Sequence, residues 1–220
     1  MGTMTRAFAN NITTSGVFKP TAFNNASFDN VTAVPEGAVE GGSMVLLSTQ
    51  TASSSASISF TTGIDSTYKE YMFIYNNVAP SSTANFMFNL STDGGSNYNV
   101  VKTTTSFMAY HFEDDAYTTF TYDTGSTLSL AQSTNYQTIT ATMNGSTDNS
   151  SSGYLHLFNP SSTTYVKHFL AVSNGYGENL YSINHFKAGY ANTSSAINAI
   201  NFKMNTGNID AGTIQMFGIL

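Results

Sequence analysis

The segment Tyr136–Met143 (YQTITATM) indicates the fold class of this 220-residue chain. Ile139, Ala141 and Met143 alternate with threonines, and a period of two residues is typical of a β-strand with one buried face. Threonine on the other face favours strand structure without adding charge. We therefore expect this segment to be a strand that covers a hydrophobic core on one side.

Similar segments recur from residue 44 onward, separated by short stretches rich in glycine and asparagine. Ser57–Thr61 alternates in the same way, whereas Tyr71–Tyr75 is bulky throughout and is predicted to be covered on both faces. Turn signals such as Asp93–Ser96 and Asn174–Gly175 separate these runs. The other predicted strands are Met44–Ser48, Phe86–Leu90, Ser106–His111, Thr118–Tyr122, Gly153–Phe158, Thr164–Val172, Asn184–Tyr190, Ala199–Met204 and Gly212–Ile219.

Short strands of this kind, joined by such turns, predict an all-β fold, an antiparallel jelly-roll-like β-sandwich with an extended N-terminal arm. The sandwich is expected to span residues 44–220 as a single domain. Within it, Ile64–Glu70 and Thr193–Ile200 have room for no more than a helical turn or two.

Residues 1–43 differ from the rest and are expected to form the extended arm. They sustain neither helical nor strand periodicity, and Pro20 and Pro35 interrupt them. Either the segment is a solvated tail, or its apolar residues dock on a neighbouring subunit and become ordered on binding. We favour docking, because a solvated tail has little use for large apolar side chains. The residues predicted to contact the partner are Phe18, Phe23, Phe28, Val31 and Val34.

The chain is poor in charge: charged residues make up 9%, with 7 Lys+Arg against 13 Asp+Glu and a net charge of −6. So few cations exclude nucleic-acid binding through phosphate neutralisation. No apolar run is long enough to cross a membrane, and no apolar stretch follows the first residues as in a secretory signal peptide. The lack of cysteine removes disulfides and thiolate chemistry. We expect neither nucleic acid nor a membrane as a partner.

Catalytic and cofactor motifs are not found in the sequence. The run His111–Asp115 has the oxygen ligands that a divalent cation requires, but an acidic loop after a strand is the preferred interpretation. A hairpin turn explains Asp93–Asn97. Glu113, Asp115 and Asp123 are carboxylates of the kind that glycosidases use, yet no pattern pairs them. We predict no enzyme activity, no cofactor and no metal, and leave open whether Glu113–Asp115 binds a cation.

Histidines and tyrosines leave further alternatives open. His156 and His168 fall within apolar alternation, so a place in the core or an inter-strand hydrogen bond is preferred over metal ligation. Tyr176, Tyr181 and Tyr190 lie near glycine-rich loops and suit either a sugar-binding platform or aromatic packing between subunits. Packing is preferred because the chain has no tryptophan, which is usually prominent in sugar-binding sites.

Five stretches together carry a resemblance to a known family: Leu47–Ser55, Ile58–Tyr68, Leu90–Tyr98, Leu155–Ser162 and the terminal Met204–Ile219. They resemble structural proteins of marine bacteriophages, of the kind found in cyanophages and pelagiphages. The likeness covers roughly residues 44–220 and includes no catalytic motif. It supplies no functional residues that can be carried over to this chain.

The resemblance implies a non-enzymatic virion protein that is assembled in the cytoplasm of a host bacterium. Its expected partners are other virion proteins, the major capsid protein or tail proteins, together with copies of itself in a homo-oligomer, for which a trimer is favoured. The first expectation is a capsid decoration or cement protein anchored to the shell by residues 1–43. The alternatives are a tail-fibre or receptor-binding protein that recognises host glycans and, more distantly, a free carbohydrate-binding module or glycan-degrading enzyme.

Overall fold

A computed structural model describes residues 43–146 and 148–220 of the chain. In these ranges it contains twelve β-strands and no helix, so Ile64–Glu70 and Thr193–Ile200 hold no helical turn. The predicted contact residues Phe18, Phe23, Phe28, Val31 and Val34 lie outside the described residues. The strands are β1 (Met44–Thr51), β2 (Ile58–Phe60), β3 (Glu70–Pro80), β4 (Ala84–Ser91), β5 (Lys102–Phe112), β6 (Thr118–Tyr122), β7 (Gln137–Met143), β8 (Ser151–Phe158), β9 (Lys167–Gly177), β10 (Tyr181–Ala191), β11 (Ala199–Met204) and β12 (Ile209–Ile219).

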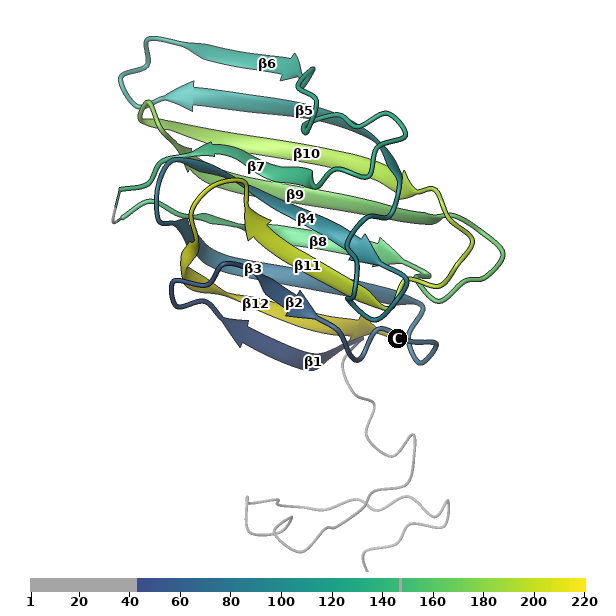
Figure 1. Cartoon of the computed structure of the whole chain (residues 1–220). Coiled ribbons are helices and arrows are strands. Elements are labelled where there is room, and N and C mark those ends of the chain that lie inside the picture. The colour runs from purple at the N-terminus through teal and green to yellow at the C-terminus, as the bar shows by residue number, and fades with distance from the viewer. Residues whose placement is uncertain (1–42, 147) are drawn as a thin grey trace, which may run out of the picture. The chain divides into compact units, whose positions relative to one another are not determined.

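The strands form two antiparallel layers that are joined at one point (Figure 1). The larger sheet has the order β1-β12-β3-β8-β9-β10-β5-β6. The smaller sheet has the order β7-β4-β11-β2 and lies over one side of the larger sheet. The two join where Met143 of β7 pairs with Gly177 of β9. This arrangement confirms the prediction of an all-β, antiparallel, sandwich-like fold.

The hydrophobic core lies between the two sheets and contains a cluster of phenylalanine rings. Phe73 of the larger sheet packs edge-on against Phe60 of the smaller sheet, with ring centroids 5.5 Å apart. Phe86 and Phe202 stack beside them at 5.8 Å. All four side chains are buried, and burial of each contributes about 1.5–3 kcal/mol. The alternation in β2, β4 and β11 therefore identified the core-facing side, whereas the continuous bulky run in β3 did not.

Some strand boundaries differ from those expected. The pair Asn174–Gly175 was predicted to be a turn, but it lies inside β9, which continues to Gly177. β9 and β10 pair over eleven residues each, and the chain reverses at Leu180, whose φ is +59°. The long ladder supplies hydrogen bonds at Asn174 and Gly175, so the local turn preference is overridden by pairing with a neighbouring strand.

Candidate functional site

The acidic run His111–Asp115 ends β5 and forms an exposed turn. His111 Nε2 lies 2.9 Å from Asp115 Oδ1, and both side chains are largely exposed. Asp114 Oδ1 accepts a hydrogen bond from the backbone N–H of Ala116. In the described part of the chain, no group of three His, Asp or Glu side chains is placed to hold a metal ion. The geometry of this run is that of a turn closed by its own side chains.

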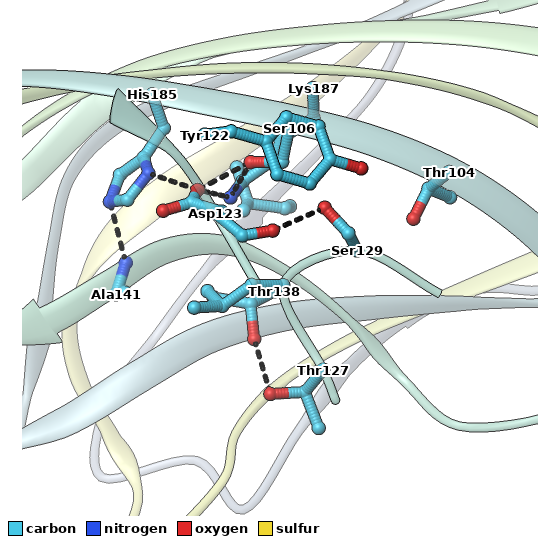
Figure 2. A network of polar contacts seen from close by, with 12 residues as sticks. Thr104, Ser106, Tyr122, Asp123, Thr127, Ser129, Thr138, Ala141, His185 and Lys187 are labelled. Atoms are coloured by element: carbon cyan, nitrogen blue, oxygen red, sulfur yellow. Dashed lines mark hydrogen bonds and ion pairs between the residues drawn. The ribbon is translucent and has the colours of Figure 1, made fainter. Parts of the chain in front are cut away.

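A buried polar network lies between the sheets, centred on Asp123 just after β6 (Figure 2). Lys187 Nζ of β10 donates a hydrogen bond to Asp123 Oδ2 at 2.7 Å and a second one to Ser106 Oγ. Ser106 Oγ in turn donates to Asp123 Oδ2. His185 Nε2 accepts from the Ala141 N–H at 3.2 Å, so the ring proton lies on Nδ1, which is 3.4 Å from the same carboxylate oxygen. The Asp123 carboxylate thus contacts the amine of Lys187, the hydroxyl of Ser106 and the imidazole of His185.

The electrostatics of this network favour an ionised Asp123. Burial by itself would raise the pKa of Asp123, but the contacts of His185, Lys187 and Ser106 outweigh it and hold that pKa below its ordinary value. Burial lowers the pKa of His185, and Asp123 only partly opposes this effect. The pKa of Lys187 is also lowered by burial against the attraction of Asp123.

A serine, a histidine and an aspartate so close together invite comparison with a hydrolase triad. Here the serine hydroxyl is engaged by Lys187 and Asp123 and does not contact His185 Nε2, which faces the backbone of β7. All four side chains are buried, so a substrate has no route to the hydroxyl. We assign the network to the stability of the fold. In the sequence Asp123 is an isolated carboxylate beside a turn, and no local pattern links it to Lys187 or His185.

Two further buried lysines have no carboxylate partner in the described residues. Lys102 Nζ donates to Asn89 Oδ1 and to the Val100 carbonyl, and Lys167 Nζ donates to the Thr193 carbonyl at 3.0 Å. Burial lowers the pKa of Lys102 to about 7. A neutral amine has two N–H groups, so Lys102 can keep its hydrogen bonds to Asn89 Oδ1 and to the Val100 carbonyl when it loses its proton.

The outer face of the larger sheet, on the side away from the smaller sheet, is the second candidate site. Directly paired residues of neighbouring strands share a face, so the register defines two rows of side chains that cross the sheet. The first row comprises Leu46, Phe217, Met72, His156, Leu170, Ala188 and Thr105. The second row comprises Thr49, Gln215, Ile74, Tyr154, Val172, Phe186, Phe107 and Tyr122.

Neither row of the outer face contains an aspartate, glutamate, lysine or arginine. Glu70, beside the first row, lies 2.8 Å from His156 Nε2, so this carboxylate already has a partner within the face. Phe107 stacks on Phe186 with ring centroids 4.9 Å apart, and Phe120 of β6 lies against Phe107 at 5.3 Å. Taken together, the two rows place aromatic and aliphatic groups on every strand from β1 to β6. The polar positions among them are His156 and Thr105 in the first row and Thr49 and Gln215 in the second.

The outer face is hollowed over β9 and β10. One hollow of about 460 Å³ is lined by Phe158, His168, Leu170 and Tyr190, and a second of about 350 Å³ by Phe107, Tyr154, Val172 and Phe186. Thr105, Leu170 and Ala188 line both, so the two hollows are continuous. The small side chain of Ala188 forms the floor between large aromatic neighbours, which leaves room for side chains from a partner.

Several sequence predictions change at this face. Tyr71–Tyr75 was expected to be covered on both sides, but its Met72 and Ile74 face outward and are only half-buried in the described part of the chain. His168 is exposed on the outer face beside Tyr190, so the prediction of a core position is wrong for it. His156 bridges to Glu70, in agreement with an inter-strand contact.

The three tyrosines considered as a sugar-binding platform do not form one surface. Tyr190 lies on the outer face, while Tyr181 is buried on the other side of β10 and packs against Phe112 with ring centroids 5.1 Å apart. Tyr176 lines a separate polar hollow of about 490 Å³ together with Glu113 and Asp148. Burial and the nearby carboxylate of Glu113 raise the pKa of Tyr176.

Comparisons with protein-family models, with curated proteins and with solved structures found no match for this chain. The part of the chain that the structure describes has no helix long and apolar enough to span a membrane. The outer face is therefore interpreted from its own geometry and chemistry. The sequence does not reveal this face because its residues lie on separate strands, and only the order and register of the strands bring the apolar ones together.

Proposed function

We propose that this protein is a non-enzymatic structural subunit of a bacteriophage virion that assembles through the outer face of its larger sheet. The observation that carries this proposal is the pair of charge-free side-chain rows that cross the sheet from β1 toward β6. Monomeric soluble proteins rarely expose large apolar patches, and such patches mark sites of association. The sequence resemblance to phage structural proteins supplies the virion as the setting.

Within the virion, we propose decoration of the capsid shell as the first role. Residues 1–43, with their apolar side chains at Phe18, Phe23 and Phe28, would anchor the sandwich to the major capsid protein. A rigid antiparallel sandwich without disulfides suits a protein that folds in bacterial cytoplasm and then persists outside the cell. Because charged residues make up only 9% of the chain, its surface is largely uncharged.

A tail-fibre or receptor-binding role is the second candidate, and one observation favours it. The polar hollow lined by Tyr176, Glu113 and Asp148 offers an aromatic ring beside carboxylate acceptors. Such a combination suits the apolar face and the hydroxyl groups of a sugar. The hollow lies at the end of β5 and β9, away from the centre of the outer face.

Immunogold imaging of intact phage particles tests the location directly. We expect label distributed over the head for a decoration protein, whereas label confined to the tail would establish the second candidate. Particles without any label would contradict the virion proposal. A chain lacking residues 1–43 should keep the unfolding temperature of the full chain and lose attachment to the particle. Unchanged attachment of the truncated chain would contradict the anchoring role.

A further inference from the structure

The outer face has the dimensions of a complete protein interface. Strands lie about 4.8 Å apart and rise about 3.3 Å per residue, so eight strands with central members of eleven residues cover on the order of 1,000 Å². A stable interface of standard size buries about 800 Å² on each partner. The face is thus large enough to bind one partner without help from any other part of the domain.

The sequence of β3 also indicates that this face is covered in the working state of the protein. A run that is bulky throughout is typical of a strand buried on both sides. In the described residues, Phe73 and Tyr75 are fully buried toward the smaller sheet, while Met72 and Ile74 point outward into the uncovered face. The apolar character of the outward positions has no use in an isolated domain.

We propose that the partner of the outer face is a second copy of this chain, packed face to face about a two-fold axis. The inference rests on the proposed function only in treating the face as an assembly surface. Two-fold association requires a surface that complements itself, and a face without charged rows meets its own copy without like-charge repulsion. The chain carries a net charge of −6, so two rows without charged side chains let two copies approach at a low electrostatic cost.

The shape of the outer face also supports self-association, because protruding side chains and a hollow lie on the same face. Aromatic side chains stand out near β6, where Phe120 is 71% exposed and Tyr122 is 53% exposed. The continuous hollow over Ala188 lies on the same face, over β9 and β10. About a two-fold axis, Phe120 and Tyr122 of each copy can enter the hollow of the other copy. The two equivalent contacts then form at the same time. A partner with a charged surface would find no complementary charge in either row.

Leu170 offers a direct test because it lies in the first row, lines both hollows and is 47% exposed. Leu170→Glu places two carboxylates into the proposed interface and leaves the core between the sheets intact. We expect the full-length wild-type protein to have twice the chain mass of 23.6 kDa at micromolar concentration in light scattering and sedimentation. The variant should be monomeric, with a dissociation constant raised at least about 100-fold.

Leu180→Glu is the matched control, since Leu180 is 54% exposed in the turn between β9 and β10. This variant should remain a dimer. Phe107→Ser is a second variant that shortens a side chain of the second row without adding charge, and it should also weaken the dimer. Far-UV circular dichroism confirms that each variant is folded before its mass is interpreted.

Three outcomes would overturn the inference: a monomeric wild type, a trimeric wild type, or a dimer that survives both Leu170→Glu and Phe107→Ser. The test is independent of the particle location. Gold label on the virion together with a monomeric protein in solution would leave the proposed function standing and refute the face-to-face pair. A dimer in solution without gold label on any particle would support the face-to-face pair and refute the proposed function.

Discussion

Replacing Asp123 by asparagine tests whether the buried network stabilises the fold. The substitution keeps the size of the side chain and removes the negative charge, which leaves Lys187 buried without an ionic partner. Removal of one member of a buried pair costs about 3–5 kcal/mol, because the remaining charge is neither solvated nor compensated. For a domain of this size each kcal/mol lowers Tm by about 2–4 °C, so we expect a decrease of roughly 6–20 °C.

Thermal and urea unfolding followed by circular dichroism at pH 7 measure this change. Glu178→Gln is the matched control, because it removes the same charge from an exposed side chain next to the β9–β10 turn. This control should change the free energy of unfolding by less than about 0.5 kcal/mol. A similarly small effect for Asp123→Asn would refute the reasoning, since it would mean that the Lys187 charge has no need of the carboxylate.

The double variant Asp123→Asn with Lys187→Met separates the ion pair from the loss of side-chain packing. Without the lysine there is no uncompensated cation, so part of the stability lost in the single variant should return. We expect the double variant to be more stable than Asp123→Asn alone by at least about 1 kcal/mol. Additive losses in the two single variants would show that Asp123 and Lys187 act independently, in contradiction to their 2.7 Å contact.

Three further predictions follow from other parts of the structure. As the pH rises above 7, the folded protein releases a proton from Lys102 that the unfolded chain keeps until its pKa of 10.5 is approached. Stability therefore rises with pH in this range, and Lys102→Met should reduce the slope by up to about 1.4 kcal/mol per pH unit. An unchanged slope in urea unfolding across this range would contradict a neutral Lys102. Gly153→Ala should destabilise the domain by about 1–3 kcal/mol in urea unfolding, because the Cβ of the alanine would overlap the Val172 carbonyl oxygen. A stability equal to that of the wild type would show that β8 and β9 can move apart at this position. EDTA should leave Tm unchanged, since the His111–Asp115 turn is closed by its own side chains, whereas a large decrease would reveal a bound cation.

Local pattern was enough to find most strands of this protein. Thr118–Tyr122 and Ala199–Met204 were predicted with the bounds that the structure has, and Tyr136–Met143 differs from β7 by one residue. Alternation of apolar and polar residues is a property of neighbouring positions in the chain, so it can be identified without knowledge of the fold. Buried lysines interrupt the alternation at Lys102 and Lys167. The predicted strand therefore began several residues after the true start of β5 and several residues before the true start of β9.

The candidate sites were beyond the reach of such local patterns. Asp123 and Lys187 lie far apart in the sequence, and only the antiparallel pairing of β5 with both β6 and β10 brings them together. The inward position of Lys187 follows the period of β10, but a lysine in an alternating strand is ordinarily assigned to the solvent side. A partner for the buried charge was not visible until the strand order was known.

The sequence by itself determined the all-β class, the residues that alternate toward a core and a charge-poor surface. Only the tertiary structure decided that eight strands lie side by side in one sheet and that their outward residues form two mostly apolar rows without charged side chains. Strand formation depends on residues that are neighbours in the chain, whereas strand order and register depend on contacts between distant segments and on how the two sheets pack. An assembly surface made of one residue from each strand arises only at that second level.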